Sequence, residues 1–397
     1  MEEAQQRELA KGTLGVLGGA IFVTMLGVGI ITPFLPLYAR QMGASAFFMG
    51  LIFGAFSLSR LLAMPFVGPW SDRRGRKSFI VIGLLGFSLT ALLMKAADTP
   101  YELILARIFM GVCSAMVMPV SMALVADVTP IGREGRNIGG FNTAFLLGLG
   151  MGPLLGGVIY DSQGVATNFV LMAVLTLVAA ALTAWRVKEP PEELRSAERL
   201  SWWSQFALLG DLQMLGIFIC RAGGAAAMGF FIAFLPVLGV DKGLSNSQVG
   251  VLLACNVLVM TGMQSWAGRL ADRLPRAPLA LGFQLATGLL KSLLPLAAGF
   301  QGLLLLVMLE GATSGLGLPA LTALAMARGR EMKVGMGVVM GLFTIGLSIG
   351  VFSGPTLGGL VADHLGISAT FQLSGACAAL SSLALLPQLR KDPAGRA

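Results

Sequence analysis

Twelve long blocks of apolar residues, separated by short polar segments, run through almost the whole chain. A helix needs about 20 apolar residues to cross the hydrocarbon core of a bilayer. Only 12% of the 397 residues are charged and 55% are hydrophobic, whereas about 25% of the residues of a soluble domain are charged. The sequence therefore predicts an all-α polytopic membrane protein. The expected transmembrane helices are residues 14–38, 47–70, 78–97, 100–126, 137–161, 167–186, 208–239, 246–268, 278–300, 302–327, 335–362 and 368–387.

Lysine and arginine gather at alternate ends of these blocks. With the N-terminus inside, the inner segments hold 21 of the 28 basic residues, the outer ends hold three and the spans hold four. Positive charge stays cytoplasmic, so both termini are expected in the cytoplasm. The short loops, the compact linker and the lack of an N-x-[ST] site in the sequence favour a plasma membrane, a bacterial inner membrane. The polar start of the chain is not expected to be a cleavable signal peptide. The net charge of +8 reflects topology, and no nucleic-acid partner is expected.

The second half of the chain repeats the first half at an offset near 200 residues. Matching positions recur in four regions: Pro36 and Pro236, Asp72 and Asp272, Gly111 and Gly311, and Asp161 and Asp363. An even number of spans per half keeps both copies in the same orientation. We therefore expect two pseudo-symmetric six-helix halves, residues 1–186 and residues 208–397, joined by a cytoplasmic linker, residues 187–207.

Five motifs give the chain a family resemblance. They are LGVGIITPFLP (26–36), GPWSDRRGRK (68–77), RIFMGVCSA from Arg107, ADVTPIGREGR (126–136) and GLGMGPLLGG (148–157). In this order they resemble the major facilitator superfamily (MFS), and in particular its twelve-span drug:proton antiporters. The resemblance implies the MFS fold and a secondary active transporter that works by alternating access. It also implies a monomer that needs no cofactor, with the proton gradient as its energy source.

The second of these motifs forms a charged turn between two spans. By resemblance it is a gating latch that holds the cytoplasmic side shut, with a weaker copy in the second half that lacks the glycine of the turn. The alternative is that its charges only set the topology of the helices. The latch residues are expected to be Asp72, Arg73, Arg76 and Asp127, with Asp272 and Arg273 in the second copy.

A glycine-rich motif lies inside the fifth span and recurs in the eleventh, as GVFSGPTLGG. Small residues let helix backbones approach closely in a membrane, and a proline inside a helix favours a kink. One interpretation is plain helix packing, and the other, by resemblance to antiporters, is a role in setting the direction of transport. The motif consists of Gly148, Gly152, Pro153, Gly156 and Gly157.

Charges inside spans are costly and mark functional candidates. Glu310 is the only acid clearly inside a span, and Lys291 is expected at the same depth in the neighbouring span. Two hypotheses remain open: Glu310 is a proton-coupling site, or it forms a permanent bridge to Lys291. Because spans one, four, seven and ten line the central cavity in the family, Arg107 and Arg221 are expected near the substrate path with Glu310. The amides of Asn142 and Asn256 are further candidates for substrate binding.

These charges bear on what is transported. The three cavity charges are two positive and one negative, and the first span contains no acid. We therefore expect proton-coupled export of drugs or amphipathic small molecules that are anionic, zwitterionic or neutral. The alternative is an importer or facilitator of a small organic anion or metabolite. An enzyme is not expected, because one histidine and four scattered cysteines provide neither a catalytic pair nor a metal site.

Overall fold

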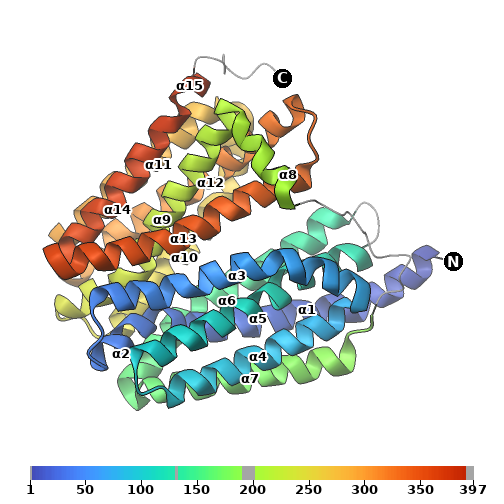
Figure 1. Ribbon diagram of the computed structural model, residues 1–397, viewed down its shortest axis with the longest axis horizontal. Helices are drawn as coiled ribbons and strands as arrows, with labels where there is room; N and C mark the ends of the chain where they lie inside the picture. The colour runs from blue at the N-terminus through green and yellow to red at the C-terminus, as the bar shows by residue number, and fades with distance from the viewer. Residues whose placement is uncertain (1, 130–132, 190–201, 390–397) are drawn as a thin grey trace. The chain divides into compact units, whose positions relative to one another are not determined.

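The computed structural model describes residues 2–129, 133–189 and 202–389, and among these residues there are helices and turns but no strand (Figure 1). Twelve helices are long and apolar enough to cross a membrane, which confirms the predicted number of spans. The main helices are α1 (Glu2–Ile31), α2 (Leu35–Gln41), α3 (Ala46–Arg74), α4 (Arg76–Ala96), α5 (Pro100–Val128), α6 (Glu134–Gln163), α7 (Val165–Arg186), α8 (Trp202–Ala207), α9 (Leu212–Asp241), α10 (Asn246–Arg273), α11 (Arg276–Leu293), α12 (Gly299–Glu331), α13 (Met336–Leu365), α14 (Ile367–Ser382) and α15 (Leu386–Leu389).

The chain forms two compact units. The first unit contains Met1–Leu35 and Leu58–Arg199, and the second contains Pro36–Ser57 and Leu200–Ala397. The helix α2 and the beginning of α3 therefore pack with the second half of the chain. The expected division into residues 1–186, 187–207 and 208–397 stays a prediction, and residues 190–201 of that linker lie outside the described residues.

Four helix pairs of the first unit recur in the second unit, which has the α10–α12 pair in addition. In the first unit α1 packs against α6 and α7, and α4 packs against α5 and α7. In the second unit α9 packs against α13 and α14, α10 against α12, and α11 against α12 and α14. Because α13 and α9 repeat α6 and α1, the internal repeat of the sequence reappears as a repeat of helix contacts.

The glycine-rich motif of α6 is a contact surface against α1. A methyl group added at Gly148, Gly152 or Gly156 would overlap backbone atoms of α1, and Gly157 is buried on the same helix. Pro153 lies inside α6. In the second copy, Gly350 of α13 approaches the backbone of α9 in the same way. The close-packing interpretation therefore accounts for both copies, whereas a role in the direction of transport stays a prediction.

Candidate functional site

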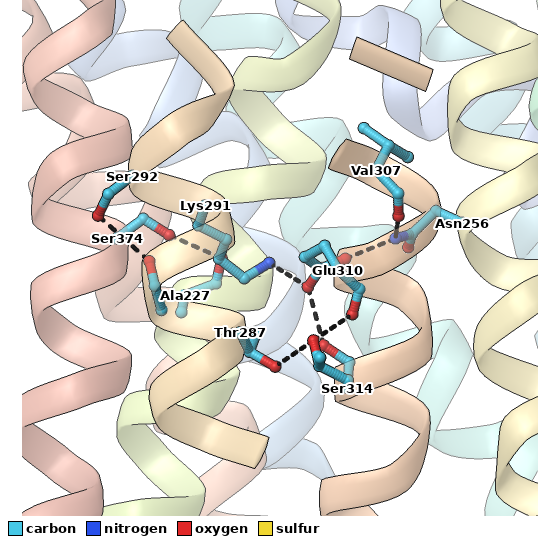
Figure 2. A network of polar contacts seen from close by, with 11 residues as sticks. Ala227, Asn256, Thr287, Lys291, Ser292, Val307, Glu310, Ser314 and Ser374 are labelled. Carbon is cyan, nitrogen blue, oxygen red and sulfur yellow. Dashed lines mark hydrogen bonds and ion pairs between the residues drawn. The ribbon is translucent and has the colours of Figure 1, made fainter. Parts of the chain in front are cut away.

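A buried ion pair joins α11 and α12 inside the second unit. The Nζ atom of Lys291 lies 2.6 Å from Oε1 of Glu310, and the two residues are only 2% and 3% exposed. The expectation that the two residues share a depth is thus confirmed (Figure 2). Charged side chains inside membrane spans pair with one another, because a single unpaired charge in hydrocarbon is costly.

Two further donors hold the Glu310 carboxylate. The Nδ2 atom of Asn256, from α10, donates to Oε2 at 2.5 Å, and the hydroxyl of Ser314, one turn further along α12, donates to Oε1 at 2.8 Å (Figure 2). Asn256 also donates to the carbonyl oxygen of Val307 at 3.0 Å. All three neighbours of the carboxylate are donors, so its two oxygens accept from side chains on three different helices.

Close helix contacts allow this geometry. A methyl group at Gly311 would overlap the backbone oxygen of Asn256, so this glycine lets α10 approach α12 beside the carboxylate. On the other side the Thr287 hydroxyl donates to the Thr313 hydroxyl at 2.9 Å, which ties α11 to α12 one turn below the ion pair. The Nζ atom of Lys291 also lies 4.3 Å from the ring centroid of Phe231 on α9, within the range of a cation–π contact.

The Glu310 carboxylate depends on its neighbours in this structure. Its three donors come from Lys291, Asn256 and Ser314. A carboxylate that lost the ammonium of Lys291 would be an uncompensated buried charge, which is costly. The role of Glu310 in proton coupling stays a prediction.

Three arginines place further positive charge inside spans. Arg107 is 1% exposed, and its Nη1 atom lies 3.4 Å from the sulfur of Met110. The guanidinium of Arg221 lies 4.6 Å from the ring centroid of Phe343, and its buried Nε atom has no hydrogen-bond partner among the described residues. Arg60 reaches the sulfur of Met118 at 3.9 Å. For Arg60 and Arg221, the sulfur and aromatic partners leave positive charge available to a ligand.

The charged turn between α3 and α4 is closely paired, as the latch hypothesis requires. The buried guanidinium of Arg76 lies 3.2 Å from Oδ1 of Asp72 and 2.9 Å from Oδ2 of Asp127. Arg73 is exposed to solvent. The ion pairs bring together three of the expected residues, and their gating role stays a prediction.

A third acid at this turn, Glu189, was not anticipated from the sequence. The carboxylate of Glu189, directly after α7, accepts hydrogen bonds from the backbone amides of Arg76 at 2.6 Å and Lys77 at 2.8 Å. The residue before α4 is Gly75, which has no side chain to cap the helix. A glycine at a helix start offers no side-chain cap, and this was the one local sign that the first amides of α4 could bind an acceptor from elsewhere in the chain.

The remaining candidates are more scattered. Asn142 is half-buried on α6 of the first unit, whereas Asn256 and Glu310 meet in the second unit. Asp272 and Arg273 end α10, and their side chains lie outside the described residues. Within the part of the chain that the structure describes, no three His, Cys, Asp or Glu side chains gather as metal ligands would.

Comparisons of the sequence and of the structure with known proteins all find membrane transporters. The model of the Major Facilitator Superfamily matches residues 17–245 and, a second time, residues 217–397. An uncharacterized MFS-type transporter of Methanocaldococcus jannaschii is 31% identical over 358 residues, which cover 89% of this chain and 92% of that protein. Multidrug resistance protein 2 of Bacillus subtilis is 28% identical over 375 residues, 91% of each chain. A crystal structure of the nucleoside transporter NupG has a TM-score of 0.82 at 12% identity, and the match covers 94% of this chain and 99% of NupG.

Proposed function

The chain belongs to the Major Facilitator Superfamily, and on that premise we propose that it exports amphipathic small molecules in exchange for protons. It is a multi-pass membrane transporter with twelve spans. The proposed orientation places both termini in the cytoplasm of a bacterial cell, with the protein in the inner membrane. The proposed mode is alternating access, in which the two halves expose a central site to each side of the membrane in turn.

The buried Lys291–Glu310 pair is the observation that carries the proton-coupling proposal. Its carboxylate draws its donors from α10, α11 and α12, so a relative shift of these helices changes how many donors it keeps. In one state Glu310 is ionised and paired, and in the other it loses a donor and binds a proton. Because proton binding then depends on conformation, a proton gradient biases the conformational cycle.

The charge balance within the spans supports the proposed substrate class. The carboxylate of Glu310 is already neutralised by Lys291. The described contacts of Arg60 and Arg221, by contrast, are with sulfur or aromatic groups. An anionic or zwitterionic group relieves this excess positive charge, since a guanidinium binds carboxylates and phosphates in a fork geometry. The relative named Multidrug resistance protein 2 supports amphipathic drugs as cargo.

Two alternatives follow from the same contacts. A permanent Lys291–Glu310 bridge would only hold α11 to α12, because all its donors are satisfied in this state. In that case the protein would be a facilitator or importer of a small organic anion, with no need for a proton gradient. Both alternatives predict that neutralising Glu310 leaves gradient dependence unchanged.

The test is transport in proteoliposomes with an imposed pH gradient. Wild type, Glu310→Gln and the control Glu331→Gln, which neutralises an exposed acid near the end of the same helix, are compared. The substrates are a carboxylate amphiphile, its neutral methyl ester and a cationic amine of the same size. We expect gradient-driven movement in wild type and the control, and movement without gradient dependence in Glu310→Gln. Gradient-driven movement that survives in Glu310→Gln would refute the coupling role of this residue.

A further inference from the structure

The helix α3 takes part in both compact units. Its beginning, from Ala46 to Ser57, packs with the second half of the chain, and its remainder, from Leu58 to Arg74, packs with the first half. One continuous helix therefore belongs to both units. The contacts of its first turns are those that fix this part of α3 within the second unit.

The beginning of α3 lies directly against the backbone of α13. A methyl group at Gly50 would overlap the carbonyl group of Pro355, and one at Gly359 would overlap the carbonyl group of Ala46. The two helices thus approach each other closely at a glycine on each helix, Gly50 of α3 and Gly359 of α13. A separation of about 0.5–1 Å already removes about a quarter to a half of the dispersion energy of such a contact.

The carboxylate of Asp363 fastens the first turn of α3 to α13. Its Oδ1 atom accepts a hydrogen bond from the amide of Ala46 at 2.7 Å, and its Oδ2 atom accepts one from the amide of Phe47 at 3.0 Å. The first amides of a helix have no acceptor within the helix. A carboxylate at this position gains two charge-assisted hydrogen bonds and a favourable interaction with the helix dipole.

The internal repeat shows that this arrangement differs from a local cap. In the second copy, α10 begins with a capping box: the amide of Gln248 donates to the Ser245 hydroxyl, and the Gln248 side chain accepts from the amide of Ser245. The first copy keeps the serine, as Ser45, but has Phe48 where the box needs glutamine. The cap of α3 therefore comes from a residue that is 317 positions away from Ala46.

We propose that Asp363 is a positioning residue of the transport cycle: it locks the start of α3 to α13, and its release lets the start of α3 move away from α13. This inference rests on the proposed function, because a lock matters only if the two halves alternate. The ion pair of Arg40 with Asp241, at 2.6 Å, lies in the same unit. The side chains of this ion pair are 48% and 37% exposed. The pair therefore contributes little compared with the two hydrogen bonds of Asp363 to the first amides of α3.

The experiment measures the separation of α3 from the second half without any substrate. Spin labels are attached at Met42, before α3, and at Leu296, which is 77% exposed after α11. The background has its four cysteines replaced by serine. Distance distributions are recorded in lipid nanodiscs for Asp363→Ala, for Asp363→Asn and for the control Asp98→Ala, which removes another exposed acid outside the contact.

The two Asp363 variants should form a graded series. Asp363→Ala removes both acceptors and should raise the ratio of long to short distances about fivefold, the factor that corresponds to the loss of a cap worth about 1 kcal/mol. Asp363→Asn keeps one acceptor oxygen and should give an intermediate ratio, and Asp98→Ala should match the wild type. Unchanged distances in Asp363→Ala would overturn the proposal.

A second variant separates a lock from a simple helix cap. Phe48→Gln in the Asp363→Ala background rebuilds the serine–glutamine box of α10 at the start of α3, and amide hydrogen exchange reports whether this start is again protected. Under the proposal, protection returns while the long distances persist. If the short distance also returns, Asp363 acts only through helix stability and the lock is refuted. Because no substrate is involved, failure of the proposed export would leave this result unaffected, and the reverse also holds.

Discussion

A double-substitution cycle at the buried ion pair gives the most demanding test of the site. The variants are Lys291→Met, Glu310→Gln and both substitutions together. Each charge lies at 2–3% exposure, so water cannot compensate for a lost partner. Removing one partner of a buried pair costs about 3–5 kcal/mol, whereas replacing both by neutral groups is often close to neutral.

The contacts of the pair place each variant within that range. After Lys291→Met, Glu310 still accepts from Asn256 and Ser314, so we expect a loss of about 3 kcal/mol. After Glu310→Gln, the ammonium of Lys291 keeps the ring of Phe231 as its neighbour, and the loss should be about 4 kcal/mol. The double variant should lose only about 1–2 kcal/mol and should therefore be more stable than either single variant.

The free energy of unfolding is measured by titration with sodium dodecyl sulfate in mixed micelles, with circular dichroism as the signal. Glu331→Gln is the control, because its ion pair with Arg328 is 64% exposed on the glutamate side and should change stability by less than about 1 kcal/mol. A double variant whose loss equals the sum of the two single losses would show that the charges do not depend on each other. The description of the site as one coupled network would then be wrong.

Four further predictions concern other parts of the molecule. The hydrogen bonds from Arg328 lower the pKa of Asp211, so this pair stabilises the fold above the ordinary pKa of about 3.9 and the contribution disappears as the pH falls through the lowered pKa. Unfolding measurements should therefore show Asp211→Asn about 1 kcal/mol less stable than wild type at pH 7, and this difference should shrink as the pH falls through the lowered pKa of Asp211. Gly152→Val should destabilise the protein by about 3 kcal/mol, because the new side chain overlaps α1, whereas Gly139→Val, in open space on the same helix, should not change the melting temperature through packing. Arg107→Ala should impair transport of a carboxylate amphiphile more than that of its methyl ester, and equal losses would indicate a purely structural arginine. Glu189→Ala should speed hydrogen exchange at the first amides of α4, where its two hydrogen bonds are lost, and unchanged exchange there would contradict its role as a cap.

Some features of the site could be anticipated from the sequence because they are local. Lys291 and Glu310 flank one short hairpin, so counting residues from the hairpin was enough to place them at the same depth. The four-residue spacing of Gly148, Gly152 and Gly156 likewise predicted a flat helix face. In both cases helical geometry converts sequence distance into position.

Other features could not be anticipated, because their partners are far apart in the chain. Asn256 was a candidate on its own, but nothing in its surroundings indicated that it would share a carboxylate with Ser314. Glu189 and Asp363 reach helix starts that are 112 and 317 residues away. Such contacts depend on which helix ends meet, and no periodic pattern in the sequence records that.

The sequence by itself determined the number of spans, their repeat and the family, because apolar length, charge asymmetry and motif spacing are properties of single segments. The tertiary structure alone decided which buried charges are neutralised and which helix ends are capped from a distance. The physical reason is that a charge or an open amide inside a bundle must find a partner within about 3 Å. Only the packed arrangement of the helices brings such partners into reach.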